Sequence, residues 1–156
     1  STNADAHCAL ADTYMKDKEY DKAILEYQKA SQLVPDNESV LIKLGNAYKA
    51  KSETKNALDM YQKVIFKNLK NTDAMFNAGL CYAELNDNNN AIKSFKNVIA
   101  IDPNYAYAYY ALGMAYENEK NYPESIANYE KFMTLTDDNE TKAQVKNQIE
   151  YLKNKK

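Results

Sequence analysis

The stretch ALGMAYENEKNYPESIANYEKF, residues 111–132, has the hydrophobic pattern of two helices joined by a turn. Gly113 lies inside the first helical pattern, although glycine in a helix interior costs about 1 kcal/mol relative to alanine. The chain has only three glycines, Gly45, Gly79 and Gly113, and their spacings are equal: 79 − 45 = 34 and 113 − 79 = 34. None stands at a predicted turn, so this shared position requires the absence of a side chain.

A period of 34 residues runs through most of the chain. Four copies align without insertion or deletion, at 4–37, 38–71, 72–105 and 106–139, and residues 140–156 follow them. Such self-similarity is the sequence signature of a repeat protein. Positions are counted from the first residue of each copy. The aligned residues are Leu10, Leu44, Ala78 and Leu112 at position 7; Ala11, Gly45, Gly79 and Gly113 at position 8; Tyr14, Tyr48, Tyr82 and Tyr116 at position 11; Ala23, Ala57, Ala91 and Ser125 at position 20; and Tyr27, Tyr61, Phe95 and Tyr129 at position 24.

This pattern resembles the tetratricopeptide repeat, in which W-x2-L-G-x2-Y is followed by A-x3-F and a proline. The resemblance covers residues 4–139. It implies an all-α fold, a right-handed α-solenoid of four helix-turn-helix repeats. Residues 140–156 are then a C-terminal capping helix, and residues 1–3 a linker or cloning remnant. Large packing residues replace the family's tryptophan, namely His7, Leu41, Met75 and Tyr109.

The repeat explains why glycine is needed. Positions 4, 7, 8 and 11 lie on one arc of the first helix of each copy, and positions 20, 24 and 27 on one arc of the second. We expect these arcs to face each other. Small residues at positions 8 and 20 then let the backbones approach closely, while aromatic rings at positions 11 and 24 fill the space beside them. We expect Gly79→Leu to overpack this contact and to destabilise the fold by about 1–3 kcal/mol.

Helix-boundary signals agree with this division. Asn37, Asn71 and Asn104 precede the first helices of copies two to four and are predicted to cap them. Pro123 stands just inside a second helix, where proline is tolerated. Residues 136–140 are predicted to cap the tail helix, whose apolar stripe should cover the end of the array. That stripe consists of Val145, Ile149 and Leu152.

Composition excludes several classes of function. The chain has 20 lysines, no arginine and a net charge of −2, so it lacks the electropositive footprint of a nucleic-acid-binding protein. No apolar run is long enough to span a bilayer, so we expect no direct membrane insertion. Its two cysteines, Cys8 and Cys81, cannot build a disulfide framework and fit a reducing compartment. We expect a soluble protein, with the cytoplasm favoured.

Catalytic signals are absent from the sequence. The single histidine, His7, stands at position 4, where the repeat needs a packing residue, and Cys8 points about 100° away from it around the helix. Cys81 stands at a position of small residues and is interpreted as a buried, inert thiol. The run NDNNN at 86–90 lacks the length and the closing glutamate of a calcium loop. We therefore expect no enzymatic activity, no cofactor and no metal site.

The resemblance also implies where a ligand binds. The usual peptide site of this family is the concave surface of the first helices, to which positions 2, 5, 9 and 12, the groove positions, are predicted to contribute. Phe76, Tyr107, Tyr110 and Met114 would anchor a ligand there. The full set of candidate peptide-binding residues is Ile42, Asn46, Lys49, Phe76, Asn77, Leu80, Tyr107, Tyr110 and Met114, and Glu117 also stands at a groove position.

These candidates have stated roles and one alternative. Asn46 and Asn77 would hold a peptide backbone, and Lys49 an acidic group. For Ile42 and Leu80 the alternative is packing between neighbouring first helices. That interpretation is less natural for Tyr107 and Tyr110, because tyrosine has a polar end that needs water or a partner.

One subclass of the family binds acidic chaperone tails through a two-carboxylate clamp. Only Asn46 and Asn77 match its residues here. Uncharged residues stand at its basic positions, namely Ile42, Tyr107 and Ala111. We therefore do not expect chaperone-tail binding, although Lys43 and Lys49 could hold a single carboxylate.

The sequence thus predicts a non-catalytic protein–protein interaction module that binds a peptide or a partner helix in its concave groove. Two alternatives remain open. The chain could be a self-association or assembly scaffold, in which case its partner is a second copy of itself. It could also be the recruiting domain of a larger enzyme. The sequence does not name the partner protein.

Overall fold

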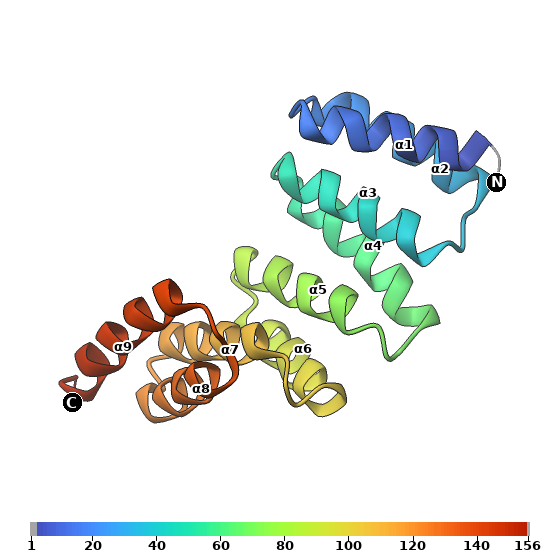
Figure 1. Ribbon diagram of the computed structural model, residues 1–156. Helices are drawn as coiled ribbons and strands as arrows, with labels where there is room; N and C mark the ends of the chain where they lie inside the picture. The colour runs from blue at the N-terminus through green and yellow to red at the C-terminus, as the bar shows by residue number, and fades with distance from the viewer. Residues whose placement is uncertain (1–2, 156) are drawn as a thin grey trace. The chain divides into compact units, whose positions relative to one another are not determined.

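The structure, a computed structural model, describes residues 3–155. These residues form nine α-helices and no strand (Figure 1). The helices are α1 (Asn3–Lys16), α2 (Tyr20–Leu33), α3 (Glu38–Ala50), α4 (Thr54–Lys67), α5 (Thr72–Glu84), α6 (Asn88–Ile101), α7 (Ala106–Asn118), α8 (Tyr122–Leu135) and α9 (Asn139–Lys153). Of the residues predicted as a linker, Ser1 and Thr2 lie outside the described residues. Asn3 is the first residue of α1, so it is helical and not part of a linker.

The helices fall into two compact units. Unit 1 is Ser1–Cys81, and unit 2 is Tyr82–Lys156. In unit 1, consecutive helices pack on one another from α1 to α4. In unit 2, consecutive helices pack on one another from α6 to α9. Each unit therefore contains at least one complete helix–turn–helix pair together with contacts from one copy to the next.

Asparagine and aspartate side chains begin several helices. The Oδ1 atom of Asn37 accepts the Val40 amide at 3.1 Å, and Oδ1 of Asn71 accepts the Ala74 amide at 2.9 Å, as predicted. The N-cap of α7, however, is Tyr105. Asn104 is not the cap, because it lies one residue too early; its backbone N–H donates to Oδ1 of Asp102 at 3.0 Å in the turn before the helix.

The turns inside the four copies use a left-handed residue that is never glycine. Lys18, Ser52, Asn86 and Lys120 have φ values of 59°, 65°, 60° and 58°. All four stand at position 15 of their copies. This conformation costs a residue with a Cβ atom roughly 1–2 kcal/mol. The turns thus bear a conformational cost that glycine would relieve, whereas the glycines stand in the helices.

The glycines permit close contact between paired helices, as predicted for position 8. A Cβ atom added to Gly45 would lie 2.7 Å from Cε1 of Tyr61 on α4. One added to Gly113 would lie 2.5 Å from Cδ1 of Tyr129 on α8. The buried Ser125 hydroxyl, at position 20, donates to the Gly113 carbonyl at 2.8 Å. Positions 8, 20 and 24 therefore meet in this pair of helices. The same close contact at Gly79 stays a prediction.

Each unit has its own apolar core. In unit 1 the core residues come from α1, α2 and α3: Ala11, Ala23, Ile24, Tyr27, Leu44 and Ala47. In unit 2 they come from α8 and α9: Tyr129, Phe132, Val145, Ile149 and Leu152. The predicted apolar stripe of the tail helix is thus confirmed, and its N-cap is Asp138, whose Oδ1 accepts the Thr141 amide at 3.0 Å.

Candidate functional site

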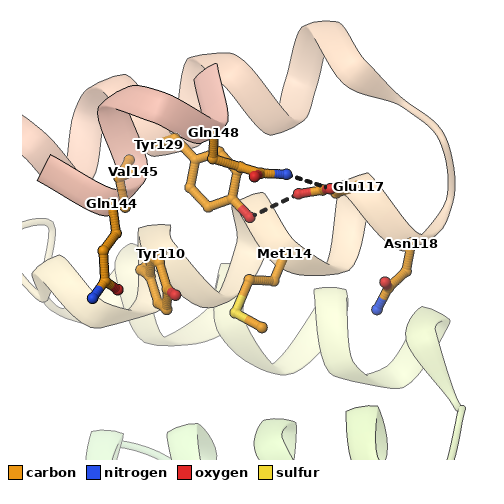
Figure 2. Close-up of a pocket in the computed structure, with 8 residues that line it drawn as sticks. All are labelled: Tyr110, Met114, Glu117, Asn118, Tyr129, Gln144, Val145 and Gln148. Carbon is orange, nitrogen blue, oxygen red and sulfur yellow. Dashed lines mark hydrogen bonds between the residues drawn. The ribbon is translucent and has the colours of Figure 1, made fainter. Parts of the chain in front are cut away.

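A pocket of about 380 Å³ opens in unit 2 between α7, α8 and α9 (Figure 2). It is lined by Tyr110, Met114, Glu117, Asn118, Tyr129, Gln144, Val145 and Gln148. Two of the predicted ligand anchors, Tyr110 and Met114, therefore lie in one concavity. Glu117, the third groove-position residue of α7 in this pocket, lies beside them.

Helical spacing places these side chains together. On α7, the residues Tyr110, Met114 and Glu117 are separated by four and then three positions, so they share one face. On α9, Gln144 and Gln148 are four positions apart and share a face in the same way. Tyr129 reaches the pocket from α8, past the backbone of Gly113.

The base of the pocket is aromatic and well supported. The ring of Tyr110 lies 5.8 Å from that of Tyr129 and 5.2 Å from that of Phe132, measured between centroids, and both pairs are tilted. Val145 packs in the same core and is buried. Met114 is instead 48 % exposed. The pocket therefore combines a fixed base with an accessible, flexible side chain.

Glu117 forms the polar centre of the pocket. Its Oε2 atom accepts the Tyr129 hydroxyl at 3.1 Å, and its Oε1 atom accepts the Gln148 amide at 2.6 Å (Figure 2). Burial raises the pKa of Tyr129, and the negative charge of Glu117 raises it further. The tyrosine accordingly keeps its proton and acts as a donor to the carboxylate.

Tyr107 lies one turn before Tyr110 on α7 and forms a hydrogen bond with Asp138, the N-cap residue of α9. Its hydroxyl donates to Oδ2 of Asp138 at 3.2 Å, and its ring lies 5.6 Å from that of Phe132. The hydrogen bond to Asp138 raises the pKa of the Tyr107 hydroxyl. Tyr107 is nevertheless exposed, so its ring forms part of the α7 surface beside the pocket.

The predicted site residues of unit 1 have varied surroundings. Ile42 is half-buried and packs against the cluster of Leu41, Val64 and Ala74, which agrees with the packing alternative. Asn46 is exposed, and its Oδ1 atom accepts the Tyr61 hydroxyl at 2.6 Å.

Internal bonds also occupy some of the predicted polar groups. The Asn77 amide donates within its own helix to the Asp73 carbonyl at 2.9 Å. Lys43, one of two lysines considered for a ligand carboxylate, instead donates to both oxygens of Asp12, at 3.0 and 2.7 Å. The other three predicted residues of unit 1 are half-buried, namely Lys49, Phe76 and Leu80.

Sequence reasoning missed the contribution of α8 and α9 to the pocket. The tail helix was assigned only a covering role, yet Gln144 and Gln148 stand 34 residues after Tyr110 and Met114: 110 + 34 = 144 and 114 + 34 = 148. Continuing the period by one half-copy would have placed both glutamines at groove positions. Tyr129 could not be found in this way, because it reaches the pocket through the gap beside a glycine.

The histidine and the two cysteines considered in the sequence do not line this pocket. Nδ1 of His7 lies 2.6 Å from Oε2 of Glu26, whose other oxygen accepts from Lys29 at 2.6 Å. The predicted burial of Cys81 is confirmed, and Cys8 is half-buried. No group of three or more histidine, cysteine, aspartate or glutamate side chains in residues 3–155 could hold a metal ion. None of the helices in that range is long and apolar enough to cross a bilayer.

Comparison with known families identifies the repeat. A family described as TPR repeat matches residues 12–52 and 79–120, and one described as tetratricopeptide repeat matches residues 106–139. No curated protein matches the chain.

Solved structures of MamA proteins align with nearly the whole chain. A crystal structure of MamA protein is 23 % identical, with a TM-score of 0.86 over 97 % of this chain and 82 % of its own. A second MamA crystal structure is 27 % identical, with a TM-score of 0.80 over 91 % and 81 %. MamA 41-end from Desulfovibrio magneticus RS-1 is 18 % identical, with a TM-score of 0.82 over 98 % and 96 %. These likenesses support an all-α helical-repeat solenoid.

Proposed function

Because the chain belongs to the tetratricopeptide repeat family, whose arrays present binding surfaces to other proteins, we propose that unit 2 binds a segment of a partner protein. The segment lies along the α7 face and inserts a side chain into the pocket beside α9. Tyr107, Tyr110 and Met114 are its anchors.

The exposure of Met114 carries this proposal. At 48 % exposure it is a large apolar side chain held at the mouth of a pocket. Methionine adapts its shape to different partners, and aromatic and methionine side chains are enriched at interfaces. A pocket of about 380 Å³ accepts one or two side chains of an extended segment.

The pocket is also prepared for binding before a ligand arrives. Tyr110 is held against Tyr129 and Phe132, so little ordering of the base is needed, and preorganisation lowers the free-energy cost of association. The side-chain amides of Asn118 and Gln144 have no hydrogen-bond partner within residues 3–155. They are available to pair with the backbone of a bound segment.

In unit 1 the same proposal extends to the faces of α3 and α5. There Phe76 would anchor a ligand, Asn46 and Asn77 would pair with its backbone, and Lys49 would hold an acidic group. Ile42 and Leu80 would complete the apolar part of these faces.

Selection of peptides from a random display library on the full chain tests this function. Met114→Asp places a charge at the pocket mouth without removing a core side chain. Leu25→Asp, at a residue 52 % exposed on α2, is the matched control. We expect selected peptides to bind Met114→Asp at least about tenfold more weakly, a loss of about 1.4 kcal/mol, and to bind the control like wild type. Absence of enriched peptides, or equal binding to both variants, would sink the proposal.

Self-association is a second candidate function, favoured by one observation. Phe66 is 86 % exposed at the end of α4, and Leu69 is 71 % exposed just after it. Exposed apolar residues of this size mark interaction surfaces when they lie together. Light scattering over a concentration series should show oligomers of the wild type and monomers of a Phe66→Ser/Leu69→Ser variant. A wild type that stays monomeric contradicts this candidate.

A further inference from the structure

Both units contain a tyrosine at position 24 that donates its hydroxyl to a carboxylate on the partner helix. In unit 1, the Tyr27 hydroxyl donates to Oδ1 of Asp12. In unit 2, the Tyr129 hydroxyl donates to Oε2 of Glu117. The two sites therefore share a buried tyrosine and an acidic acceptor, although the acceptor stands at position 9 in unit 1 and at position 12 in unit 2. They differ in the third group.

The third group is a cation in unit 1. The ammonium group of Lys43 lies 3.0 and 2.7 Å from the two oxygens of Asp12. It comes from α3, the first helix of the next copy, at position 6. In unit 1 a lysine ammonium group thus pairs with the carboxylate that accepts the position-24 tyrosine hydroxyl.

In unit 2 that cation is missing. The residue in the register of Lys43 is 43 + 34 + 34 + 34 = 145, which is valine and is buried. Gln148 donates to Glu117 instead, with a neutral amide. Within residues 3–155 no lysine or histidine forms an ion pair with Glu117. The charge of Glu117 also acts on Lys155, as the smallest of the effects that raise the pKa of that lysine, and the Lys155 ammonium group lies over the Tyr151 ring at 4.4 Å.

The pocket therefore holds a half-buried carboxylate that forms no ion pair within residues 3–155. Among the residues that line the pocket, Glu117 is the only acidic one, and none is a lysine or an arginine. A carboxylate offers about four acceptor sites, and Glu117 uses one on each oxygen. The rings of Tyr110 and Tyr129 line the same pocket, and aromatic faces attract cations.

We propose that this pocket takes a basic side chain, lysine or arginine, of the partner segment. Its cationic head lies on Glu117, as Lys43 lies on Asp12, and its aliphatic stem lies along Tyr110 and Met114. This inference rests on the proposed function, to which it adds the chemistry of the ligand. It also sets unit 2 apart from clamps that select acidic tails.

A pair of small probes tests the charge directly. Nα-acetyl-arginine amide carries the guanidinium group, and Nα-acetyl-citrulline amide replaces it with a neutral group of nearly the same shape. Both are titrated into the full ¹⁵N-labelled chain at low ionic strength, with the side-chain amides of Asn118, Gln144 and Gln148 as reporters. We expect the arginine probe to shift these signals with millimolar affinity and the citrulline probe to bind at least about tenfold more weakly.

Two variants distinguish the charge of Glu117 in the pocket from the net charge of the protein. Glu117→Gln removes the carboxylate but keeps an acceptor for Tyr129, and it should reduce binding of the arginine probe to the level of the citrulline probe. Glu119→Gln makes the same change of charge two residues away, at an exposed residue outside the pocket lining, and should bind like wild type. Thermal melts confirm that both variants are folded.

The outcomes distinguish this inference from the function on which it rests. Equal binding of the two probes, or full binding to Glu117→Gln, would overturn the basic side chain while leaving the pocket as a binding site. Silence of both probes, together with display peptides that depend on Met114, would also overturn it and leave the proposed function standing. Silence of the probes and absence of selected peptides would overturn both.

Discussion

Ala11 in unit 1 and Gly113 in unit 2 occupy the same position of their copies, yet only one of them has a Cβ atom. Ala11 is fully buried in the core that includes Tyr27. At Gly113 there is no room for this atom, because the Tyr129 ring lies against the backbone. The comparison teaches that the repeat requires close approach of two helices, and that glycine is needed where a ring lies against the backbone, as at Gly45 and Gly113.

The largest expected effect comes from breaking this contact in unit 2. Gly113→Ala places a Cβ atom 2.5 Å from two carbons of the Tyr129 ring, so the ring must move within a packed core. We expect a loss of about 1–3 kcal/mol of unfolding free energy, measured by urea denaturation. Ala11→Gly, the reverse change, should cost about 1 kcal/mol through helix propensity alone. A Gly113→Ala variant more stable than wild type would contradict the comparison.

Gln148→Lys would give unit 2 the third group found in unit 1. The amide already lies 2.6 Å from Oε1 of Glu117, so a lysine there can supply the missing ammonium group. If the pocket binds a basic side chain, this internal cation should compete with it and weaken binding of the arginine probe about tenfold, or about 1.4 kcal/mol. Lys146→Gln, on the exposed part of the same helix, is the control for altered charge. Unchanged binding of the arginine probe to Gln148→Lys would show that a lysine does not pair with Glu117 as Lys43 pairs with Asp12.

The ion pair of unit 1 should appear in the pH dependence of stability. Burial acts to raise the pKa of Asp12, but hydrogen bonds from Lys43 and Tyr27 outweigh it and lower this pKa. The carboxylate therefore stabilises the fold above its unfolded pKa of about 3.9 and loses this effect as the pH falls through the lower folded value.

Asp12→Asn tests that effect. Because Asp12 is partly exposed, we expect the variant to lose only about 0.5–1 kcal/mol at neutral pH. The difference from wild type should shrink as the pH falls below about 4. Urea midpoints at pH 7 and pH 3 measure this change, with Asp17→Asn as the control for an exposed carboxylate. A difference that is the same at both pH values would exclude the ionised pair as its cause.

An effect of similar size is expected for a feature in which the units agree. Lys18 and Lys120 both have left-handed backbones in the turn of their copies. Lys18→Gly and Lys120→Gly should each stabilise the chain by about 0.5–1 kcal/mol, since relief of the Cβ clash exceeds the added freedom of the unfolded chain. Urea midpoints of the two variants give the comparison. Stabilisation at one site alone would show that the turns are not equivalent.

Local features were predictable from sequence because they depend on near neighbours. The caps at Asn37 and Asn71 follow from a side chain and an amide three residues later. The contact between Gly113 and Tyr129 follows from the repeat period and helical geometry. Asn104 failed as a cap because α7 starts one residue later than a cap at Asn104 requires, and a preference for asparagine does not fix a helix start to one residue.

The site was predictable only on the helix that carries the groove pattern. Tyr110 and Met114 were predicted from their groove positions and do line the pocket, whereas its α8 and α9 sides were not predicted. Which polar side chain bonds across two copies, as Lys43 does with Asp12, depends on rotamers that a period does not fix. Ile42 shows the same limit, since a groove position can also pack against a neighbouring helix.

The register of α9 has a consequence for building longer arrays from this chain. Gln144 and Gln148 follow Tyr110 and Met114 by one period, and α9 packs on α8 as α7 packs on α6. An engineered chain with one further 34-residue copy inserted after residue 139 would therefore meet an acceptor surface that already matches it. Because α9 keeps the register of a first helix, the same helix can pack against the last copy of a longer array. The array could then be lengthened, or the copy beside the pocket exchanged, with the sequence of α9 unchanged.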